Sequence, residues 1–222
     1  MATNIELKYK SWNTLPIGKY FELREILDNY DDYEGVEGVM NLLSVLTETD
    51  VDTLLDLPIY ETDMLGEQAR FVFTKIPTGR FGLRQITIDG EKYDVVTDFS
   101  KVTTAQYIDF NTFYGDTKKY YCNILTTFII PHGKKYNQGY DPTELAELFK
   151  EKLDIETAER ACFFFARWLM NSMKIIQTLY IRSLKKMKKK EMTEEAKEKM
   201  EELIKSFQQQ KRLLDGLNTL MQ

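Results

Sequence analysis

The side chains best suited to acid–base or nucleophilic chemistry are few in this sequence and far apart. The one histidine, His132, lies in the segment IIPHGKKYNQGYDPTEL, where no flanking residue supplies a nucleophile or holds a substrate beside it. Cys122 and Cys162 are 40 residues apart in apolar runs, where a small hydrophobic side chain would serve as well. We therefore predict a histidine on a loop surface and two cysteines without a disulfide.

Sequence motifs that announce an enzyme are also missing. The chain has no glycine-rich phosphate loop, no GxSxG, no HExxH and no Cys-x-x-Cys pair. Acidic pairs such as Asp31 and Asp32 are frequent, but they occur in a segment so rich in acidic residues that pairs are expected by chance. The sequence predicts a protein without catalytic residues, cofactor or metal site.

Charge is distributed unevenly along the 222 residues, whose net charge is −5. Residues 22–63 contain thirteen acidic residues and one basic residue, Arg24, a net charge of −12, so the rest of the chain sums to +7. We name residues 22–63 the acidic segment. The strongest basic run, IRSLKKMKKKE, contains what we name the lysine cluster: Arg182, Lys185, Lys186, Lys188, Lys189 and Lys190. The lysine cluster is the predicted partner-binding site, and a solvated tip that only aids solubility is the alternative.

Nucleic acid and membranes fit the sequence less well than protein partners do. The lysine cluster has the charge to contact phosphates, and KKYY at residues 118–121 combines charge with stacking surface. However, the sequence pI is about 5.2, whereas a nucleic-acid-binding domain more often has a basic balance. No apolar run approaches the length of a membrane span, and the first residues, MATNIELKYK, lack the apolar stretch of a signal peptide. We expect a protein made in the cytoplasm, with no membrane partner.

A pattern at residues 12–23, WNTLPIGKYFEL, returns at residues 99–110 as FSKVTTAQYIDF. Both copies read as an aromatic residue before a helix start, with Pro16 near the first start and Thr103 or Thr104 capping the second. The expected apolar faces are Tyr20, Leu23 and Leu27 in the first helix, and Tyr107, Phe110 and Tyr114 in the second. Each copy is followed by a polar stretch and a second apolar segment, VMNLLSVLT or YCNILTTFII. The sequence predicts two similar helix-loop-helix units, with a coincidence of amphipathic patterns as the alternative.

Between these units, LRQITIDGEKYDVV predicts a β-hairpin over residues 83–96. Two alternating runs flank an Asp-Gly pair, which supplies the two positive φ angles of a type I′ turn. Residues 5–9 alternate apolar with polar and are expected to form an edge strand, and residues 71–77, FVFTKIP, are expected to add another. Later, Asp141 and Pro142 predict the cap and the first residue of a further helix.

The last third of the chain has the pattern of long helices. No Gly or Pro occurs from residue 154 to residue 215, apolar residues keep a four-three spacing, and Thr193 is suited to cap a second helix. The predicted fold is therefore α+β, with a mainly helical body over residues 1–155 that contains a small antiparallel β-hairpin sheet. An antiparallel helical hairpin over residues 156–222 carries the lysine cluster at its tip.

Five segments share their order and their aromatic and apolar patterns with a known group of proteins: SWNTLPIGKYFELREI, LLSVLTETDVDTLLDLP, VVTDFSKVTTAQYIDFNTF, IIPHGKKYNQGYD and ACFFFARWLM. In these segments the chain resembles small virion or tail-module proteins encoded by tailed bacteriophages of Bacteroides-type gut bacteria, including crAss-like phages. The resemblance covers residues 10 to 182 and transfers no catalytic residue.

This resemblance implies a non-enzymatic structural or assembly protein, made in the cytoplasm of the bacterial host and located in the virion, in the head–tail or tail region. Its partners would be other virion or assembly proteins, or further copies of itself. In a symmetric assembly, we expect the acidic segment of one subunit to meet the lysine cluster of the next. A tail-assembly chaperone or packaged cargo protein, and a nucleic-acid-binding accessory protein that uses the lysine cluster, are the alternatives.

Overall fold

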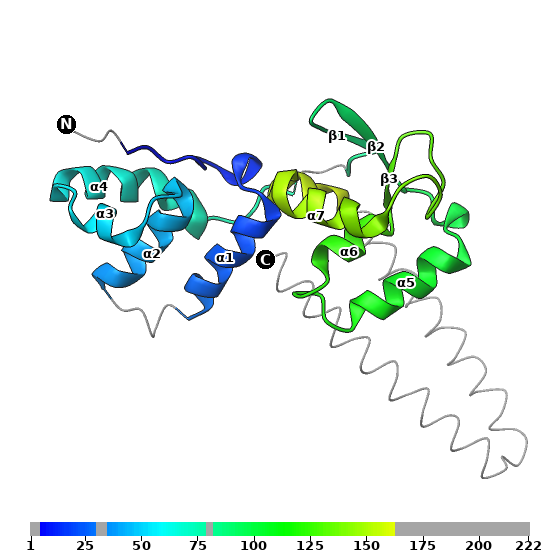
Figure 1. Cartoon of the computed structure of the whole chain (residues 1–222), viewed down its shortest axis with the longest axis horizontal. Helices are drawn as coiled ribbons and strands as arrows, with labels where there is room; N and C mark the ends of the chain where they lie inside the picture. Colours follow the sequence, from blue (N-terminus) through cyan, green and yellow to red (C-terminus); the bar gives the residue numbers. More distant parts are fainter. Residues whose placement is uncertain (1–4, 30–34, 79–81, 163–222) are drawn as a thin grey trace, which may run out of the picture.

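A computed structural model describes residues 5–29, 35–78 and 82–162 of the chain (Figure 1). In chain order the elements are η1 (Trp12–Thr14), α1 (Ile17–Asp28), α2 (Val36–Thr47), α3 (Val51–Leu55), α4 (Ile59–Gln68), η3 (Ala69–Phe73), β1 (Gln85–Ile88), β2 (Glu91–Val95), η4 (Phe99–Lys101), α5 (Thr104–Tyr114), α6 (Tyr121–Thr126), β3 (Ile129–Pro131) and α7 (Pro142–Lys152). Residues 155–162 are also helical. The α+β class is confirmed, whereas the predicted helical hairpin lies, from residue 163 onward, outside the described residues.

The described helices form two groups that meet at α1 and α7. Figure 1 shows α1 to α4 at one end and the sheet with α5 and α6 at the other, with α7 between them. Helix α7 contacts both α1 and α6, and a Cβ atom on Gly18 would lie 3.1 Å from the Lys150 carbonyl oxygen, so glycine permits this close approach. The Ile17 amide donates to the Leu153 carbonyl at 3.0 Å, and the Ile155 amide donates to the Leu15 carbonyl at 2.9 Å. One hydrophobic core extends through both groups.

The two repeated patterns have the same local structure. Each begins with a 3₁₀ turn at its aromatic residue, Trp12 or Phe99, and each continues into an α-helix that starts five residues later. The residues before these helices, Pro16 and Thr103, are both extended, with ψ angles of 152° and 159°. Thr103 also makes a reciprocal capping box with Gln106. The prediction that both copies are helix starts is confirmed.

The buried faces of α1 and α5 nevertheless differ. Tyr20 and Leu23 are buried as predicted, and so are Phe110 and Tyr114 in the second helix, but Tyr107 is 49% exposed. Gln106 is buried in its place, because its amide nitrogen donates to the Thr127 carbonyl at 2.9 Å and its oxygen accepts from the Thr103 amide. The predicted apolar face of α5 is therefore wrong at Tyr107.

The second apolar segments also differ between the two units. In the first, α2 is a helix of 12 residues that packs on α1. In the second, α6 packs on α5 but ends at Thr126, and Ile129–Pro131 form β3, which pairs with β2. The β-branched pair Ile129–Ile130 suits a strand, and tertiary pairing with β2 overrides the helical pattern of the whole segment. The second unit is therefore a helix-loop-helix followed directly by a strand of the sheet.

The predicted hairpin is confirmed, including its turn. Strands β1 and β2 pair antiparallel with Ile88 opposite Glu91, and Asp89 and Gly90 have φ angles of 50° and 87°. Adding β3 gives the order β1-β2-β3. The buried face of the hairpin lies toward α7, where the rings of Tyr93 and Phe149 meet edge to face at 5.8 Å.

The two other predicted strands are wrong. Residues 71–77 contain the end of the 3₁₀ helix η3 followed by irregular chain. Residues 5–9 are not a strand either, although Leu7 and Tyr9 are buried as their alternation predicts. The amides of Lys8 and Tyr9 donate to the Leu46 carbonyl at 2.9 and 3.2 Å, so this extended segment packs along the end of α2 instead of a sheet edge.

Replacing Gly90 with alanine is expected to lower the free energy of unfolding by about 1 to 2 kcal/mol, since a Cβ is strained in the left-handed region. Chemical denaturation followed by circular dichroism measures this loss. Gly66 in α4 is the matched control, because it is helical with open space around it, and alanine there should raise stability by about 0.5 to 1 kcal/mol. Equal effects at both positions would contradict the assigned turn.

Candidate functional site

The predicted partner-binding residues, which form the lysine cluster, lie outside the described residues. The acidic segment is described except for residues 30–34, and it forms most of α1 together with α2, α3 and the first half of α4. Figure 1 shows these helices gathered at the amino-terminal end of the described fold. The net negative charge of the acidic segment thus lies on one helical group.

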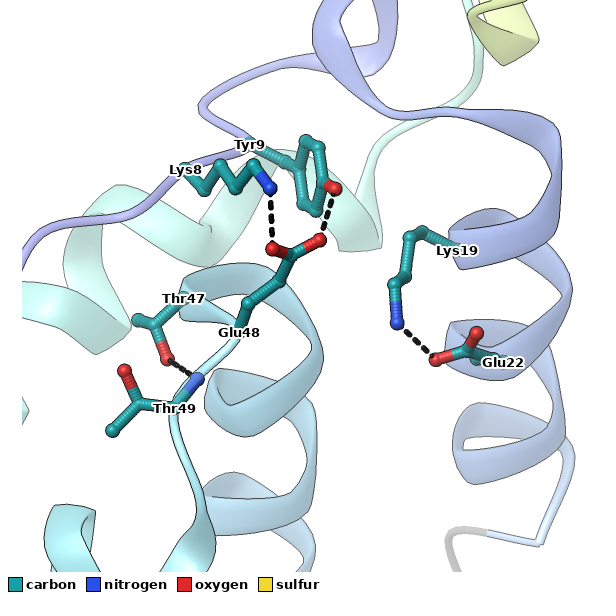
Figure 2. A network of polar contacts seen from close by, with 7 residues as sticks. All are labelled: Lys8, Tyr9, Lys19, Glu22, Thr47, Glu48 and Thr49. Carbon is teal, nitrogen blue, oxygen red and sulfur yellow. Dashed lines mark hydrogen bonds and ion pairs between the residues drawn. The ribbon is translucent and has the colours of Figure 1, made fainter. Parts of the chain in front are cut away.

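Several carboxylates in this group have structural partners. Figure 2 shows Glu48, which follows α2 in a left-handed conformation with φ 55°, accepting hydrogen bonds from Lys8 and from the Tyr9 hydroxyl. These two hydrogen bonds lower the pKa of Glu48 and tie the amino-terminal segment to the end of α2. On α1, Glu22 accepts from Lys19 at 2.8 Å (Figure 2). Asp50 caps α3 by accepting hydrogen bonds from the side chain and the amide of Thr53, which lower its pKa.

The carboxylates on and next to α3 and α4 differ from those above, because most of them have no ion-pair partner among the described residues. Asp52, Asp56 and Asp63 make no side-chain hydrogen bond or ion pair within the described part of the chain. Large apolar side chains are exposed beside them, and Ile59 is the extreme case at 81% exposure. We name the combination the α3–α4 surface: Leu55, Asp56, Ile59, Tyr60, Asp63 and Met64.

The packing of α4 explains which of its side chains reach this surface. Leu65 is the buried residue of the helix, and the described chain covers only that side of it. At 100° per residue, Ile59, Tyr60 and Met64 fall on the opposite half of the helix together with Asp63. A surface helix normally carries polar residues on its solvent face. Because these apolar side chains are exposed among the described residues, they mark a candidate contact surface.

An open cleft of about 550 Å³ lies between α1, α6, α7 and the turn before α6. Its floor includes Phe21 and Tyr121, whose rings meet edge to face at 5.4 Å. Its rim carries charges of both signs: Glu22, Glu25, Asp116, Glu147, Lys118, Lys119 and Lys150. No single charge dominates the cleft, so its lining does not select a class of ligand.

Tyr121, on the floor of this cleft, belongs to a buried polar cluster. Its hydroxyl donates to Glu159 Oε1 at 2.8 Å and lies 3.8 Å from Cys162 Sγ. Glu159 Oε2 is buried and has no hydrogen-bond partner in the described part of the chain. Burial raises the pKa of Glu159 to about 7, although the hydrogen bond from Tyr121 opposes this shift. The carboxyl group is therefore largely protonated below neutral pH.

The cysteines are free and poorly suited to nucleophilic chemistry. Burial raises the pKa of Cys122 to about 12 and also raises the pKa of Cys162, where the nearby Glu159 adds to the effect. The thiolate is the reactive form, so at neutral pH both thiols stay protonated. The prediction of two cysteines without a disulfide is confirmed.

His132 lies directly after β3, at the edge of the sheet. Its Nδ1 is 2.8 Å from Asp94 Oδ2 on β2, and both side chains are substantially exposed. A hydrogen bond from Gln85, and then that from His132, lower the pKa of Asp94. Among the described residues, no serine, threonine or cysteine side chain bonds to the His132 ring, so the pair lacks the nucleophile that a catalytic triad requires.

Within the described ranges, no three His, Cys, Asp or Glu side chains are grouped so that they could hold a metal ion. No helix among the described residues is long and apolar enough to cross a membrane. No protein-family model matches the sequence, and neither curated proteins nor solved structures show a significant match to it.

Sequence reasoning found the charge of this region but missed the α3–α4 surface. The signal was present in IYETDMLGEQ, where Ile59, Tyr60 and Met64 are too many apolar residues for the solvent face of a short helix. This pattern indicates an exposed apolar surface only once the structure shows that Leu65 faces the core. Glu159 was also missed, since nothing in the run ETAERACF distinguishes a buried glutamate from one on the solvent face of a helix.

Proposed function

We propose that this chain is a non-enzymatic structural or assembly protein of a bacteriophage particle, which works by contacting other proteins through the α3–α4 surface. The observation that carries the proposal is this surface, in which exposed apolar side chains stand beside carboxylates that no cation in the described chain neutralises. Protein interfaces combine apolar anchors with charges that orient the partner. The phage assignment is supported by the sequence resemblance described above.

A virion component, a packaged cargo protein and an assembly chaperone all make such contacts. Mass spectrometry of purified virions separates them in part, because a chaperone is absent from the finished particle. We expect the protein to be present at a stoichiometry that matches the other structural proteins. Its absence from virions would favour the chaperone, and a variable copy number would favour cargo.

Nucleic-acid binding is the other class of function to which the lysine cluster is suited. The acidic helices would repel phosphates, and no basic run in the described chain matches the density of the lysine cluster. A role in binding DNA or RNA would therefore depend on the lysine cluster alone.

Replacing Lys185, Lys186, Lys188, Lys189 and Lys190 with glutamine in the phage gene is expected to abolish incorporation into the particle. Stability should change by no more than about 0.5 kcal/mol, as is usual for surface substitutions. Mass spectrometry of virions and thermal melts of the purified protein measure the two effects. Unchanged incorporation would leave the lysine cluster as solubilising charge.

The matched control changes the same amount of charge elsewhere, at five exposed lysines of the described chain: Lys75, Lys92, Lys101, Lys134 and Lys135. This control variant should still be incorporated. If the lysine-cluster variant instead loses a salt-dependent affinity for DNA or RNA that the control variant keeps, the nucleic-acid alternative holds.

A further inference from the structure

We propose that the α3–α4 surface is the docking site for the lysine cluster of a second copy of this chain, in a head-to-tail contact. The inference names the partner of the surface on which the proposed function rests. It is nevertheless separable, because a phage structural protein can use the same surface for a different protein.

Charge complementarity is the first argument. The α3–α4 surface and its flanks present Asp52, Asp56 and Asp63, which have no ion-pair partner in the described chain, whereas other carboxylates of the acidic segment are held by Lys8, Lys19 or Arg24. The lysine cluster places six cations within nine residues and no acid among them. It is the one stretch of this sequence with that density of positive charge.

Apolar complementarity is the second argument. A purely charged partner would leave Ile59, Tyr60 and Met64 in water, so the occupant of this surface must also carry apolar side chains. The basic run has them, since Ile181, Leu184 and Met187 are interleaved with its cations. A segment that is both basic and apolar matches a surface that is both acidic and apolar.

Symmetry is the third argument. Each copy of the chain supplies one α3–α4 surface and one lysine cluster, which are different patches, so the contact is heterologous. Such a contact leaves a free surface at one end and a free cluster at the other. Repeating it produces a closed ring or an open chain of copies, as a particle built from repeated subunits requires.

The experiment mixes two full-length variants. The surface variant carries Asp56→Lys, Ile59→Ser and Asp63→Lys, all at exposed positions. The cluster variant carries glutamine at Lys185, Lys186, Lys188, Lys189 and Lys190. By light scattering at low salt, we expect wild type to be larger than one chain and each variant alone to be a single chain. An equimolar mixture of the variants should form a complex of two chains, because one intact surface and one intact cluster remain.

Added salt should dissociate both wild type and the mixed complex, since the screening length shortens to about 10 Å at 0.1 M. A control with Glu144→Lys and Glu151→Lys, two exposed positions of α7, should associate as wild type does. A mixture that stays as single chains overturns the inference. So does a single-chain wild type, and if that wild type still binds another virion protein through the α3–α4 surface, the proposed function stands.

A second measurement does not depend on the substitutions being tolerated. A photoreactive phenylalanine analogue is placed at the exposed Tyr60 of the full chain, and equal amounts of ¹⁵N-labelled and unlabelled protein are mixed and irradiated. We expect cross-links to the peptide that contains the lysine cluster, with about half of the pairs joining one labelled and one unlabelled chain. Cross-links only within single chains, or none to this peptide, overturn the inference.

Discussion

Replacing Trp12 with alanine is expected to lower the free energy of unfolding by about 3 to 5 kcal/mol, the range typical of buried aromatic residues. The side chain is 5% exposed, and its ring meets those of Tyr20 and Phe71 edge to face, at centroid distances of 6.0 and 5.2 Å. Its Nε1 donates to Thr74 Oγ1 at 3.3 Å. Truncation would leave a cavity where η1 leads into α1, because rings from both sides lose their contact.

Urea denaturation followed by far-ultraviolet circular dichroism measures this loss. Tyr107→Ala is the matched control, since Tyr107 is the counterpart of Tyr20 in the second repeat but is largely exposed, and its truncation should cost no more than about 0.5 kcal/mol. Similar losses for the two variants would contradict the role assigned to Trp12. The pseudo-repeat predicts the same loss of about 3 to 5 kcal/mol for Phe99→Ala, at a position whose side chain lies outside the described part of the structure.

Glu159 is expected to make the stability of the protein fall as pH rises from 5 to 8. Burial beside Tyr121 raises the pKa of its carboxyl group from an ordinary value of 4.5 to about 7, and the residue is only 4% exposed. The folded state therefore holds the proton more tightly than the unfolded state does. Its contribution is fully present below pH 4.5 and is lost progressively as pH rises through about 7. Linkage gives about 2 to 3 kcal/mol for this change.

The comparison of wild type with Glu159→Gln isolates this effect, because glutamine has nearly the same shape and does not titrate. Relative to wild type, the variant should gain about 2 to 3 kcal/mol of stability between pH 5 and pH 8, measured by urea denaturation at both values. The other titrating groups cancel in the difference. Glu144→Gln, at an exposed position of α7, is the control for the substitution itself. A pH-independent difference for Glu159→Gln would show that the group is charged when folded.

Local chemistry is what made parts of this fold readable from the sequence. The Asp89–Gly90 turn needs two positive φ angles, and few residue pairs other than Asp-Gly or Asn-Gly supply them at little strain. Thr103 and Asp141 cap helices through hydrogen bonds to amides two or three residues away. Such interactions join near neighbours in the chain, so the identities of these residues are enough to predict the turn and the helix starts.

Elements that depend on distant partners were not readable in this way. The alternation at residues 5–9 correctly predicted which side chains are buried, but the same alternation fits a strand or an extended segment, and only the Leu46 carbonyl decides between them. Residues 129–131 continue an apolar run that begins as a helix. They form a strand because their backbone pairs with the edge of β2. Gln106 is buried because the Thr127 carbonyl needs a donor.

The candidate contact site also has one part that the sequence predicts and one part that depends on the tertiary structure. The sequence by itself determined the charges, namely the acidic segment and the lysine cluster, because charge is a property of each residue wherever it lies. Only the tertiary structure decided that Ile59, Tyr60 and Met64 are exposed, since the described residues cover one face of α4, at Leu65, and leave the other uncovered. The exposure of a side chain depends on which residues surround it in space, and the pattern along the chain does not show which residues those are.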